Sequence, residues 1–282
     1  MIRTHTTRSG MTRRILTYVA LSFMVLFSLM PLLWGVSTSL KPSREIFSIP
    51  PRWIPERITF DNYRTVLTES SIPRYFLNSL QVGGLTTFAS LVLGGLAGYG
   101  FSRFHFRGSR VGLMFILVSQ MLPLIVVMIP LYFVIDRGGL LDTPVGLSIS
   151  HLLLTMPLVT WMAMGYFNSI PYELEEATKI DGCSQLGALV RIVLPLAAPG
   201  LAASAIYAFI MSWNEFILAS VLTLSDASRT LPIGISEFSS MFRVDWGGTM
   251  AASMLISLPI IVIFLLLQQY FVSGLASGAV KG

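Results

Sequence analysis

Six long stretches without a charged side chain constrain this chain more than any other feature of its sequence. No Asp, Glu, Lys or Arg occurs within 15–40, 75–102, 111–135, 143–172, 192–214 or 246–280. A helix rises about 1.5 Å per residue, so roughly 20 apolar residues cross a hydrocarbon core of about 30 Å. Each stretch is long enough, and the pattern therefore predicts six transmembrane helices.

The composition agrees with lipid as the surrounding solvent. Of the 282 residues, 54% are hydrophobic and 12% are charged, whereas soluble domains carry about 25% charged residues. Such a chain cannot be disordered, and its single cysteine, Cys183, excludes a disulfide scaffold. We attribute the net charge of +5 to basic loops facing anionic headgroups, and we expect no nucleic-acid partner.

The expected fold class is an all-α polytopic membrane protein. Lipid cannot satisfy the open edge of a sheet, and the stretches do not alternate as the strands of a β-barrel do. The polar, basic residues 1–14 are expected to form a disordered cytoplasmic tail, and 15–282 the transmembrane domain. The first span is too long for a signal peptide, so we expect it to be retained. The six spans are predicted near 15–37, 77–101, 111–134, 146–167, 200–223 and 249–271.

The distribution of Lys and Arg over the loops bears on the orientation of the chain. With the N-terminus inside, the inner segments hold 10 of these residues and the outer segments hold 9. The inner ones lie closer to the span ends, at Arg13 and Arg14 and between Arg103 and Arg110. Because basic residues favour the cytoplasmic side, this placement favours cytoplasmic N- and C-termini.

Sequence patterns for catalysis and metal binding are missing. None of the lysines follows a glycine, so the chain has no Walker A loop for ATP. The three histidines are far apart and form no ligand cluster, and no G-x-S-x-G nucleophile motif occurs. We therefore expect that this chain is not an enzyme and holds neither metal nor cofactor.

The loop 168–199 has the most structured pattern outside the spans. Asn168 or Ser169 can cap a helix, and three glutamates in its first turns suit the helix dipole (Glu173, Glu175 and Glu176). Gly182 can end that helix in a left-handed conformation. The loop is either a docking element for a partner or an amphipathic connector lying on the bilayer.

A second short helix is expected after the glycine. Ser184 can cap it, and we expect it to end before Pro195, which lacks a backbone donor. After the first span, the segment from Thr59 to Leu67 is expected to form a short interfacial helix.

Three motifs in the loop 168–199 stand at fixed spacing. They are Glu176-Ala177-Thr178, then Asp181-Gly182, and, after nine further residues, Ile192-Val193-Leu194-Pro195. Together they resemble the EAA loop of the membrane subunits of binding-protein-dependent ABC importers. Thr178 departs from that pattern, since the family usually has alanine there.

Further motifs extend the resemblance over nearly the whole chain. They are Leu77-Asn78-Ser79, Ala97-Gly98-Tyr99, Ser102-Arg103-Phe104, Pro130-Leu131-Tyr132, Trp213-Asn214-Glu215-Phe216 and the tail from Gln269 to Gly282. Within the carbohydrate branch, the chain looks most like the six-span partner of a heterodimeric permease for disaccharides such as maltose or trehalose. The resemblance implies the type I ABC importer permease fold.

The resemblance also implies a function, partners and a location. The chain would be one half of the pathway of an ATP-driven sugar importer in the bacterial inner membrane. Its partners would be a second permease subunit, two cytoplasmic ATPase subunits holding ATP and Mg, and an extracytoplasmic sugar-binding protein or lipoprotein. The EAA loop would lie in the cytoplasm and couple to the ATPase through Glu175, Glu176, Ala177, Asp181, Gly182, Ile192, Leu194 and Pro195.

Four residues are candidates for the substrate pathway: Asn78, Trp213, Asn214 and Glu215. An acid at the bilayer centre costs at least about 2.5 kcal/mol, so Asn214 and Glu215 are expected to face the bundle interior. There they either contact sugar, with Trp213 stacking on the ring, or form structural hydrogen bonds. Asn78 has the same two interpretations.

A stand-alone secondary carrier or channel for a small polar solute is the alternative function. Such proteins usually place several ionisable groups in the membrane, and Glu215 is the one clear candidate here. His151 is expected to be a neutral, hydrogen-bonded imidazole near a span end.

Overall fold

The computed structural model describes residues 8–104, 106–238 and 244–279, with side chains described at 11, 13–104, 106–238 and 244–266. Helices form the regular structure of these residues, and no β-strand occurs among them, as expected for an all-α membrane protein. The chain divides into two compact units. One comprises the residues up to Ser70 together with Phe238–Leu255, and the other comprises Ser71–Glu237 together with the residues from Ile256.

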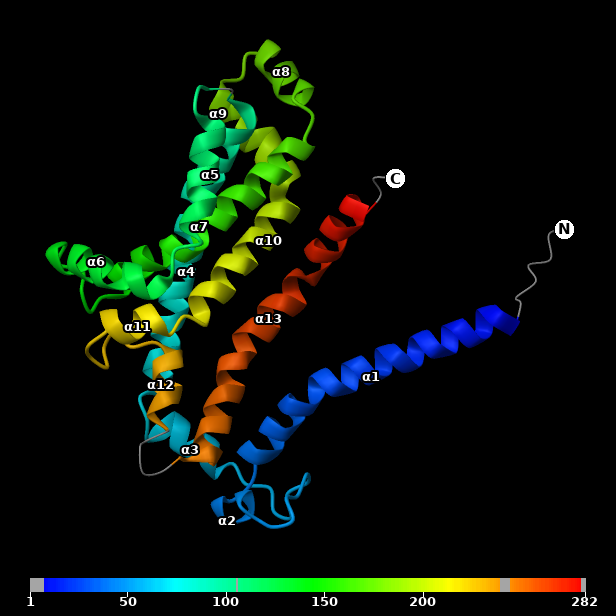
Figure 1. Ribbon diagram of the computed structural model, residues 1–282, viewed down its shortest axis with the longest axis vertical. Helices are drawn as coiled ribbons and strands as arrows, with labels where there is room; N and C mark the ends of the chain where they lie inside the picture. Colours follow the sequence, from blue (N-terminus) through cyan, green and yellow to red (C-terminus); the bar gives the residue numbers. More distant parts are fainter. Residues whose placement is uncertain (1–7, 105, 239–243, 280–282) are drawn as a thin grey trace. The chain divides into compact units, whose positions relative to one another are not determined.

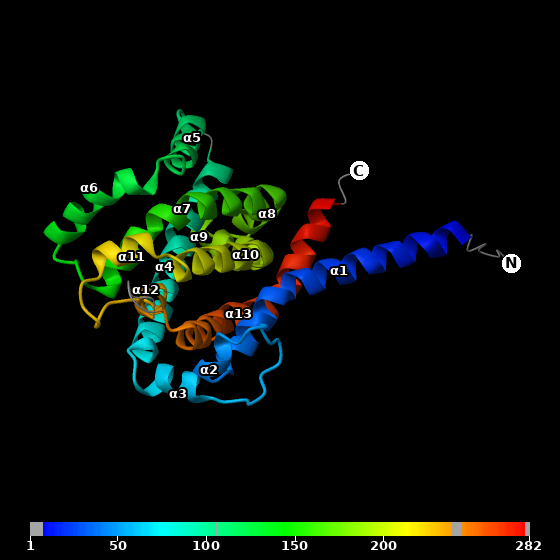
Figure 2. The ribbon, with the colours of Figure 1, turned by 60° about the horizontal axis from the view of Figure 1, so that its bottom comes forward.

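Three helices form the centre of the second unit: α4 (Ile72–Arg103), α7 (Pro144–Ser169) and α10 (Leu194–Trp213). Figures 1 and 2 show them side by side. Glycines allow the close approach, since a Cβ on Gly98 would lie 2.8 Å from a backbone oxygen of α7 and one on Gly200 would lie 2.0 Å from the Tyr166 ring. Small residues allow helices to pack closely in lipid.

Hydroxyl groups supply the polar contacts between α4 and α7. The hydroxyls of Ser90 and Thr155 lie 2.7 Å apart, and Thr86 donates to the carbonyl oxygen of Ser148 at 3.3 Å. All four residues are buried. Hydrogen bonds of this kind hold membrane helices together where the hydrophobic effect cannot.

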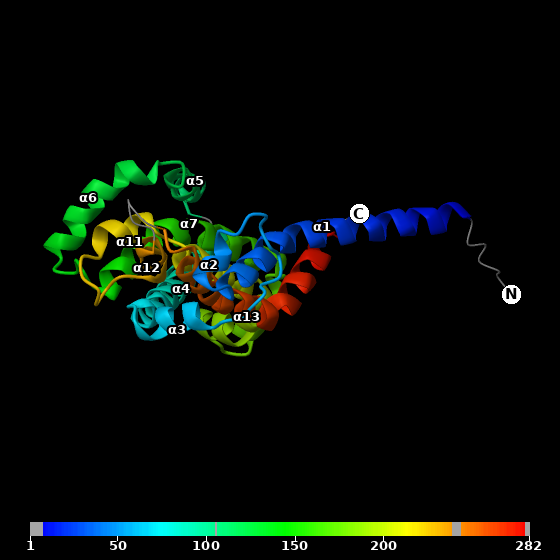
Figure 3. The ribbon, with the colours of Figure 1, turned by 90° about the horizontal axis from the view of Figure 1, so that it is seen from below.

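The third predicted span is not one continuous helix. It consists of α5 (Ser109–Ser119) and α6 (Leu124–Arg137), which are bent by 100° at the break (Figure 3). Pro123 disfavours helix at the residue before it, and Gln120 donates at the break to two carbonyl oxygens of α7 at 3.2 Å. The described helices give five candidate spans, or six when this bent pair counts as one.

The loop after α7 also differs from its prediction. It contains α8 (Glu173–Ile180) and α9 (Gln185–Ala188), which continues through a π-helical turn (Leu189–Val193) into α10. The expected end of the second helix before Pro195 is therefore wrong. The π turn explains this, because Leu194 N–H reaches back to Leu189 O and Pro195 stands in the first turn of α10, where its missing donor is tolerated.

The fifth predicted span is interrupted as well. α10 ends at Trp213, and the short helix α11 (Ile217–Leu222) follows after three residues. A further helix, α12 (Leu231–Glu237), ends the first segment of this unit, which resumes at Ile256.

The first unit contains α1 (Arg8–Ser39), α2 (Ser43–Ile46), α3 (Asp61–Thr68) and the first turns of α13 (Trp246–Ala279). The expected disorder of residues 1–14 is wrong from Arg8 onward, because α1 begins there, and residues 1–7 lie outside the described part. The predicted short helix near 59–67 is confirmed as α3. Asn62 fixes it by donating to the carbonyl oxygens of Ser39 and Lys41 at 2.9 Å.

Candidate functional site

The helix α8 lies at one end of the α4, α7 and α10 bundle (Figure 1). Gly182 ends it with a φ of 87°, the left-handed conformation predicted from the sequence. The predicted cap by Ser184 is confirmed, since its hydroxyl accepts from Gly187 N at 3.1 Å. The predicted cap at Asn168 or Ser169 is wrong, because the residue before α8 is Tyr172.

The outward side of this loop is an apolar surface edged by carboxylates. Ile180 is 86% exposed and Leu186 is 68% exposed. A Cβ built on Gly182 would meet nothing within 4 Å, so the chain itself leaves the space above this turn open. We call this set the loop surface; its members are Leu174, Glu176, Ala177, Ile180, Asp181, Gly182 and Leu186, and all are exposed.

Glu175 lies on the opposite side of α8 from the loop surface. Its residue is 0% exposed, and its carboxylate pairs with the Arg103 guanidinium, whose side chain is 7% exposed. Tyr99 donates to the same carboxylate at 2.7 Å, and Gln185 donates to Tyr99. The expected contact of Glu175 with a partner is therefore not available here; its carboxylate is fully used within the chain.

Two further contacts bind the loop to the end of α4. Arg103 donates to the carbonyl oxygen of Ile170 at 3.0 Å, and Ser102 donates to the Asn168 side chain at 2.6 Å. A buried ion pair holds its geometry only when its remaining hydrogen-bonding groups are also satisfied, as they are here. The loop and α4 should therefore move together.

The third motif of the resemblance lies under the loop rather than on its surface. Ile192 is half-buried in the π turn, and Leu194 packs against a buried cluster that includes Phe167 and Val193. Pro195 is exposed at the start of α10. This motif therefore packs beneath the loop, whereas four members of the loop surface come from the first two motifs: Glu176, Ala177, Asp181 and Gly182.

Two of the pathway candidates serve as internal contacts. Trp213 is 1% exposed, donates from Nε1 to Ile256 O at 3.1 Å and stacks on Phe209. Asn78 donates to the carbonyl oxygens of Ala227 and Arg229 at 2.9 and 2.8 Å, so it clamps the loop before α12. The expectation that Trp213 stacks on a sugar is wrong for this structure, because its ring faces are covered.

Glu215 caps α11. Its carboxylate accepts from Leu218 N at 2.8 Å and from Ala219 N at 3.0 Å, where the helix dipole favours a negative charge. The Nε2 atom of His151 lies 3.3 Å from the same carboxylate, and its Nδ1 lies 2.7 Å from the Ser212 hydroxyl. Of the two interpretations of Glu215, its contacts are therefore the structural hydrogen bonds. The sequence did not predict His151 as its neighbour.

Asn214 is the pathway candidate that remains open to a solute. It is exposed, and its side chain makes a local bond to Ile210 O at 2.9 Å. It borders a hollow of about 420 Å³ formed with Leu154, Met211, Phe216 and Ile217, among others. Glu215 also lines this hollow, but its carboxylate already accepts from the two amides of α11. α10 has 20 residues, so roughly 30 Å separates this hollow from the loop surface.

Asp142 forms a second clamp on the loop after α11. Burial alone would raise the pKa of its carboxyl, but hydrogen bonds from the hydroxyls of Ser225 and Ser228 and the amides of Leu224 and Ser225 outweigh it. The pKa of Asp142 is therefore held well below its usual range. Because the folded pKa is depressed, the clamp is complete above about pH 3.9 and is lost as the pH falls toward the folded value.

The Asp142 clamp predicts a local change in protection. In Asp142→Ala, the amides of Leu224 and Ser225 should exchange with deuterium faster at neutral pH than in the wild type, while α7 stays protected. Hydrogen exchange of the purified protein measures this, and Asp136→Ala, an exposed acid nearby, should change nothing. Equal exchange in Asp142→Ala and the wild type would contradict the clamp.

Comparisons with known proteins agree with this architecture. Residues 90–277 match the family described as "Binding-protein-dependent transport system inner membrane component". The trehalose transport system permease protein SugB of Mycobacterium tuberculosis is 38% identical over 91% of this chain and 93% of its own length. The trehalose/maltose transport system permease protein MalG of Thermococcus litoralis is 34% identical over 98% and 99%.

The fold also matches a solved structure. One chain of a bacterial ABC transporter involved in the import of the polysaccharide alginate superposes with a TM-score of 0.81 at 23% identity, covering 95% of this chain and all of that one. The family match over two thirds of the sequence places the chain in one family, and the helices of the described residues agree with it. It is a member of the binding-protein-dependent transport system inner membrane components, the permease subunits of ABC importers.

Proposed function

We propose that this chain is the membrane subunit of an ATP-driven sugar importer and that the loop surface docks on a cytoplasmic ATPase subunit. The observation that carries this proposal is the pairing of two features on α8. One side presents an open apolar surface with carboxylates, and the other is joined to α4 through Arg103 and Glu175. A surface built in this way can transmit a displacement from a docked partner to the helix bundle.

This displacement would act on a rigid pair of helices. α4 and α7 are held together by close glycine contacts and by hydroxyl pairs, so displacement of α8 would move them as one body. Bistable rigid-body movement of this kind underlies alternating access. ATP-driven closure of two ATPase subunits would thus reorient this chain and a second permease subunit around a central cavity.

The same proposal sets the orientation of the chain. An ATPase that docks on α8 puts that end of the bundle in the cytoplasm. Because this loop lies between the fourth and fifth of six predicted spans, both termini would also be cytoplasmic. The end with α11 and α12 would then face outward, where a sugar-binding protein or lipoprotein would deliver its cargo. ATP and Mg would be held by the ATPase subunits, since this sequence has no phosphate-binding loop.

A disaccharide is the cargo that the relatives support best. Among the similar proteins are permeases described as serving trehalose, trehalose and maltose, and diacetylchitobiose, the last being 35% identical in Streptomyces coelicolor. We propose trehalose or maltose as the first sugars to test.

The two polar residues after α10 should behave differently in transport. Asn214→Ala should raise the sugar concentration for half-maximal uptake, because Asn214 is exposed beside the hollow. Glu215→Ala should leave that concentration unchanged but lower the protein's unfolding free energy by about 1–3 kcal/mol, since two buried amides lose their acceptor. Uptake and thermal unfolding at matched expression measure both; a changed half-saturation in Glu215→Ala alone would contradict this division.

The energy source tests the proposed function against a stand-alone carrier or channel. Uptake of labelled trehalose or maltose should stop when cellular ATP is depleted and the ion gradient is kept intact. The chain should also co-purify with an ATPase subunit. Uptake that survives ATP depletion and stops when the gradient is collapsed would favour the carrier instead.

A further inference from the structure

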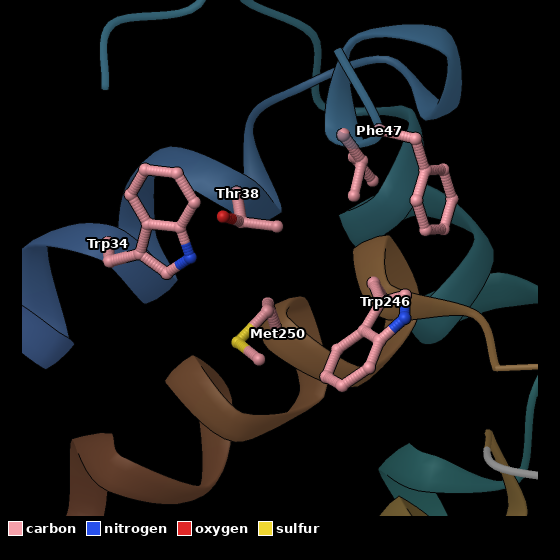
Figure 4. A pocket seen from close by; sticks show the side chains of 6 residues that line it. Trp34, Thr38, Phe47, Trp246 and Met250 are labelled. Atoms are coloured by element: carbon pink, nitrogen blue, oxygen red, sulfur yellow. The ribbon is translucent and has the colours of Figure 1, made fainter. Parts of the chain in front are cut away.

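A groove in the first unit has the lining of a site for a neutral polyol. It is formed by Trp34 and Thr38 of α1, Phe47 after α2, and Trp246 and Met250 of α13 (Figure 4), with Ile46 completing it. Its volume is about 230 Å³. Figure 4 shows the Thr38 side chain with the Trp34 ring on one side and the rings of Phe47 and Trp246 on the other.

The Thr38 hydroxyl is buried without a partner. Thr38 is 5% exposed, and its Oγ1 atom has no hydrogen-bond partner among the described residues. The indole N–H groups of Trp34 and Trp246 likewise make no hydrogen bond to a described residue. A buried polar group left unsatisfied destabilises the protein, so an occupant that pairs with Thr38 would recover that loss.

The rings are placed to pack on an apolar face. Phe47 is 68% exposed and Trp246 is 44% exposed, so both rings have free surface at the groove. Two residues outside the groove hold the Trp34 ring: Lys41 Nζ lies 4.3 Å from its centre, and Trp53 makes an edge contact with it. Lys41 is 2% exposed and donates to Arg52 O, so its ammonium group is not available to an occupant of the groove.

A second hollow adjoins the first and adds two polar side chains to its mostly apolar lining. It shares Ile46, Phe47 and Trp246 with the groove and adds Ser43 and Asp245, with a volume of about 360 Å³. One oxygen of Asp245 accepts from Gly248 N at 3.1 Å. A carboxylate and a hydroxyl beside aromatic rings suit a neutral, hydroxyl-rich molecule, and the carboxylate disfavours an anionic headgroup.

We propose that these two adjoining hollows form a sugar-binding subsite, in which the C–H face of a sugar ring packs on Trp246 and Phe47 and a sugar hydroxyl pairs with Thr38. The identification of the occupant as a sugar rests on the proposed function. In the proposed topology α1 ends outside the membrane, so the subsite lies where sugar arrives. It is separate in sequence from the pathway candidates Asn214 and Glu215.

A photoaffinity experiment tests the subsite directly. The complete transporter is placed in phosphatidylcholine nanodiscs and labelled with trehalose carrying a diazirine, and the labelled peptides are mapped by mass spectrometry. Label should fall on the segment from Trp246 to Leu255 and be displaced by unlabelled trehalose. Thr38→Val should reduce this label about five- to tenfold, the equivalent of one hydrogen bond of about 1–1.4 kcal/mol.

The valine variant also separates binding from folding. Because Thr38→Val removes an unpaired buried hydroxyl and keeps the shape, its melting temperature should equal or exceed that of the wild type. Thr68→Val, an exposed threonine of α3, is the matched control and should keep the full label. Loss of label together with a lower melting temperature in Thr38→Val would contradict the assignment, and Trp246→Leu should weaken the label independently.

The outcomes distinguish this inference from the proposed function. If ATP-driven uptake of trehalose and maltose occurs but no label falls on Trp246–Leu255, or if the label is equal in Thr38→Val, the subsite is overturned and the importer stands. A phospholipid retained by the wild type, lost from Thr38→Val and not displaced by either sugar would also overturn it. If neither sugar is taken up, the proposed cargo fails instead.

Discussion

Arg103→Ala should abolish sugar uptake and detach the loop 168–199 from the end of α4. The change leaves the Glu175 carboxylate buried at 0% exposure without its cation, and removing one partner of a buried pair costs about 3–5 kcal/mol. It also removes the bond to Ile170 O. Thermal unfolding of the purified protein, hydrogen exchange over α8 and uptake at matched expression measure the effect.

Three variants control this prediction. Arg107→Ala removes an exposed arginine from the same end of the bundle and should leave uptake unchanged. Glu175→Gln should be milder than Arg103→Ala, since an amide oxygen can still accept from Tyr99. The double variant Arg103→Met with Glu175→Leu should recover much of the lost stability, because no buried charge remains unpaired. Full uptake in Arg103→Ala would contradict a joined loop and α4.

Gly182→Asn should reduce uptake roughly tenfold or more while the protein remains stable and in the membrane. Asn tolerates the left-handed conformation that Gly182 adopts at a φ of 87°, and the chain itself leaves its Cβ in open space. The cost would therefore arise in the contact with the ATPase, where a tenfold loss corresponds to about 1.4 kcal/mol.

Gly139 provides the matched control for this change. It also has a positive φ, of 65°, and open space around its Cβ, but it lies in the loop between α6 and α7. Gly139→Asn should keep full uptake. Co-purification of the ATPase with both variants provides the measurement; an ATPase retained equally by Gly182→Asn and the wild type would argue against docking at this turn.

Local patterns were sufficient to predict much of the fold. The uncharged stretches identified the spans, and the left-handed Gly182 and the Ser184 cap follow from residue type and near neighbours alone. The break at Pro123 was missed because charge and hydrophobicity continue unchanged across it. The break after Trp213 was missed although Asn214 and Glu215 interrupt the apolar stretch there. Proline within a hydrophobic stretch was the signal available for the first break.

The pairing of distant residues could not be predicted in the same way. Arg103 and Glu175 are 72 positions apart, and His151 and Ser212 are 61 apart. Nothing in local spacing joins such groups, because the packing of α4, α7 and α10 brings them together. An arginine at the end of an uncharged stretch was a weak signal for Arg103, and His151 inside such a stretch was a stronger one for an internal partner.

Photocrosslinking from the loop surface tests directly whether α8 docks on an ATPase. A photoreactive phenylalanine analogue replaces Ile180, which is 86% exposed, and in a control replaces Leu224, which is 58% exposed near the other end of the bundle. In membranes containing the complete transporter, position 180 should yield an adduct with the ATPase subunit and position 224 should not. No ATPase adduct at position 180 in an assembled, transport-active complex would contradict docking at α8.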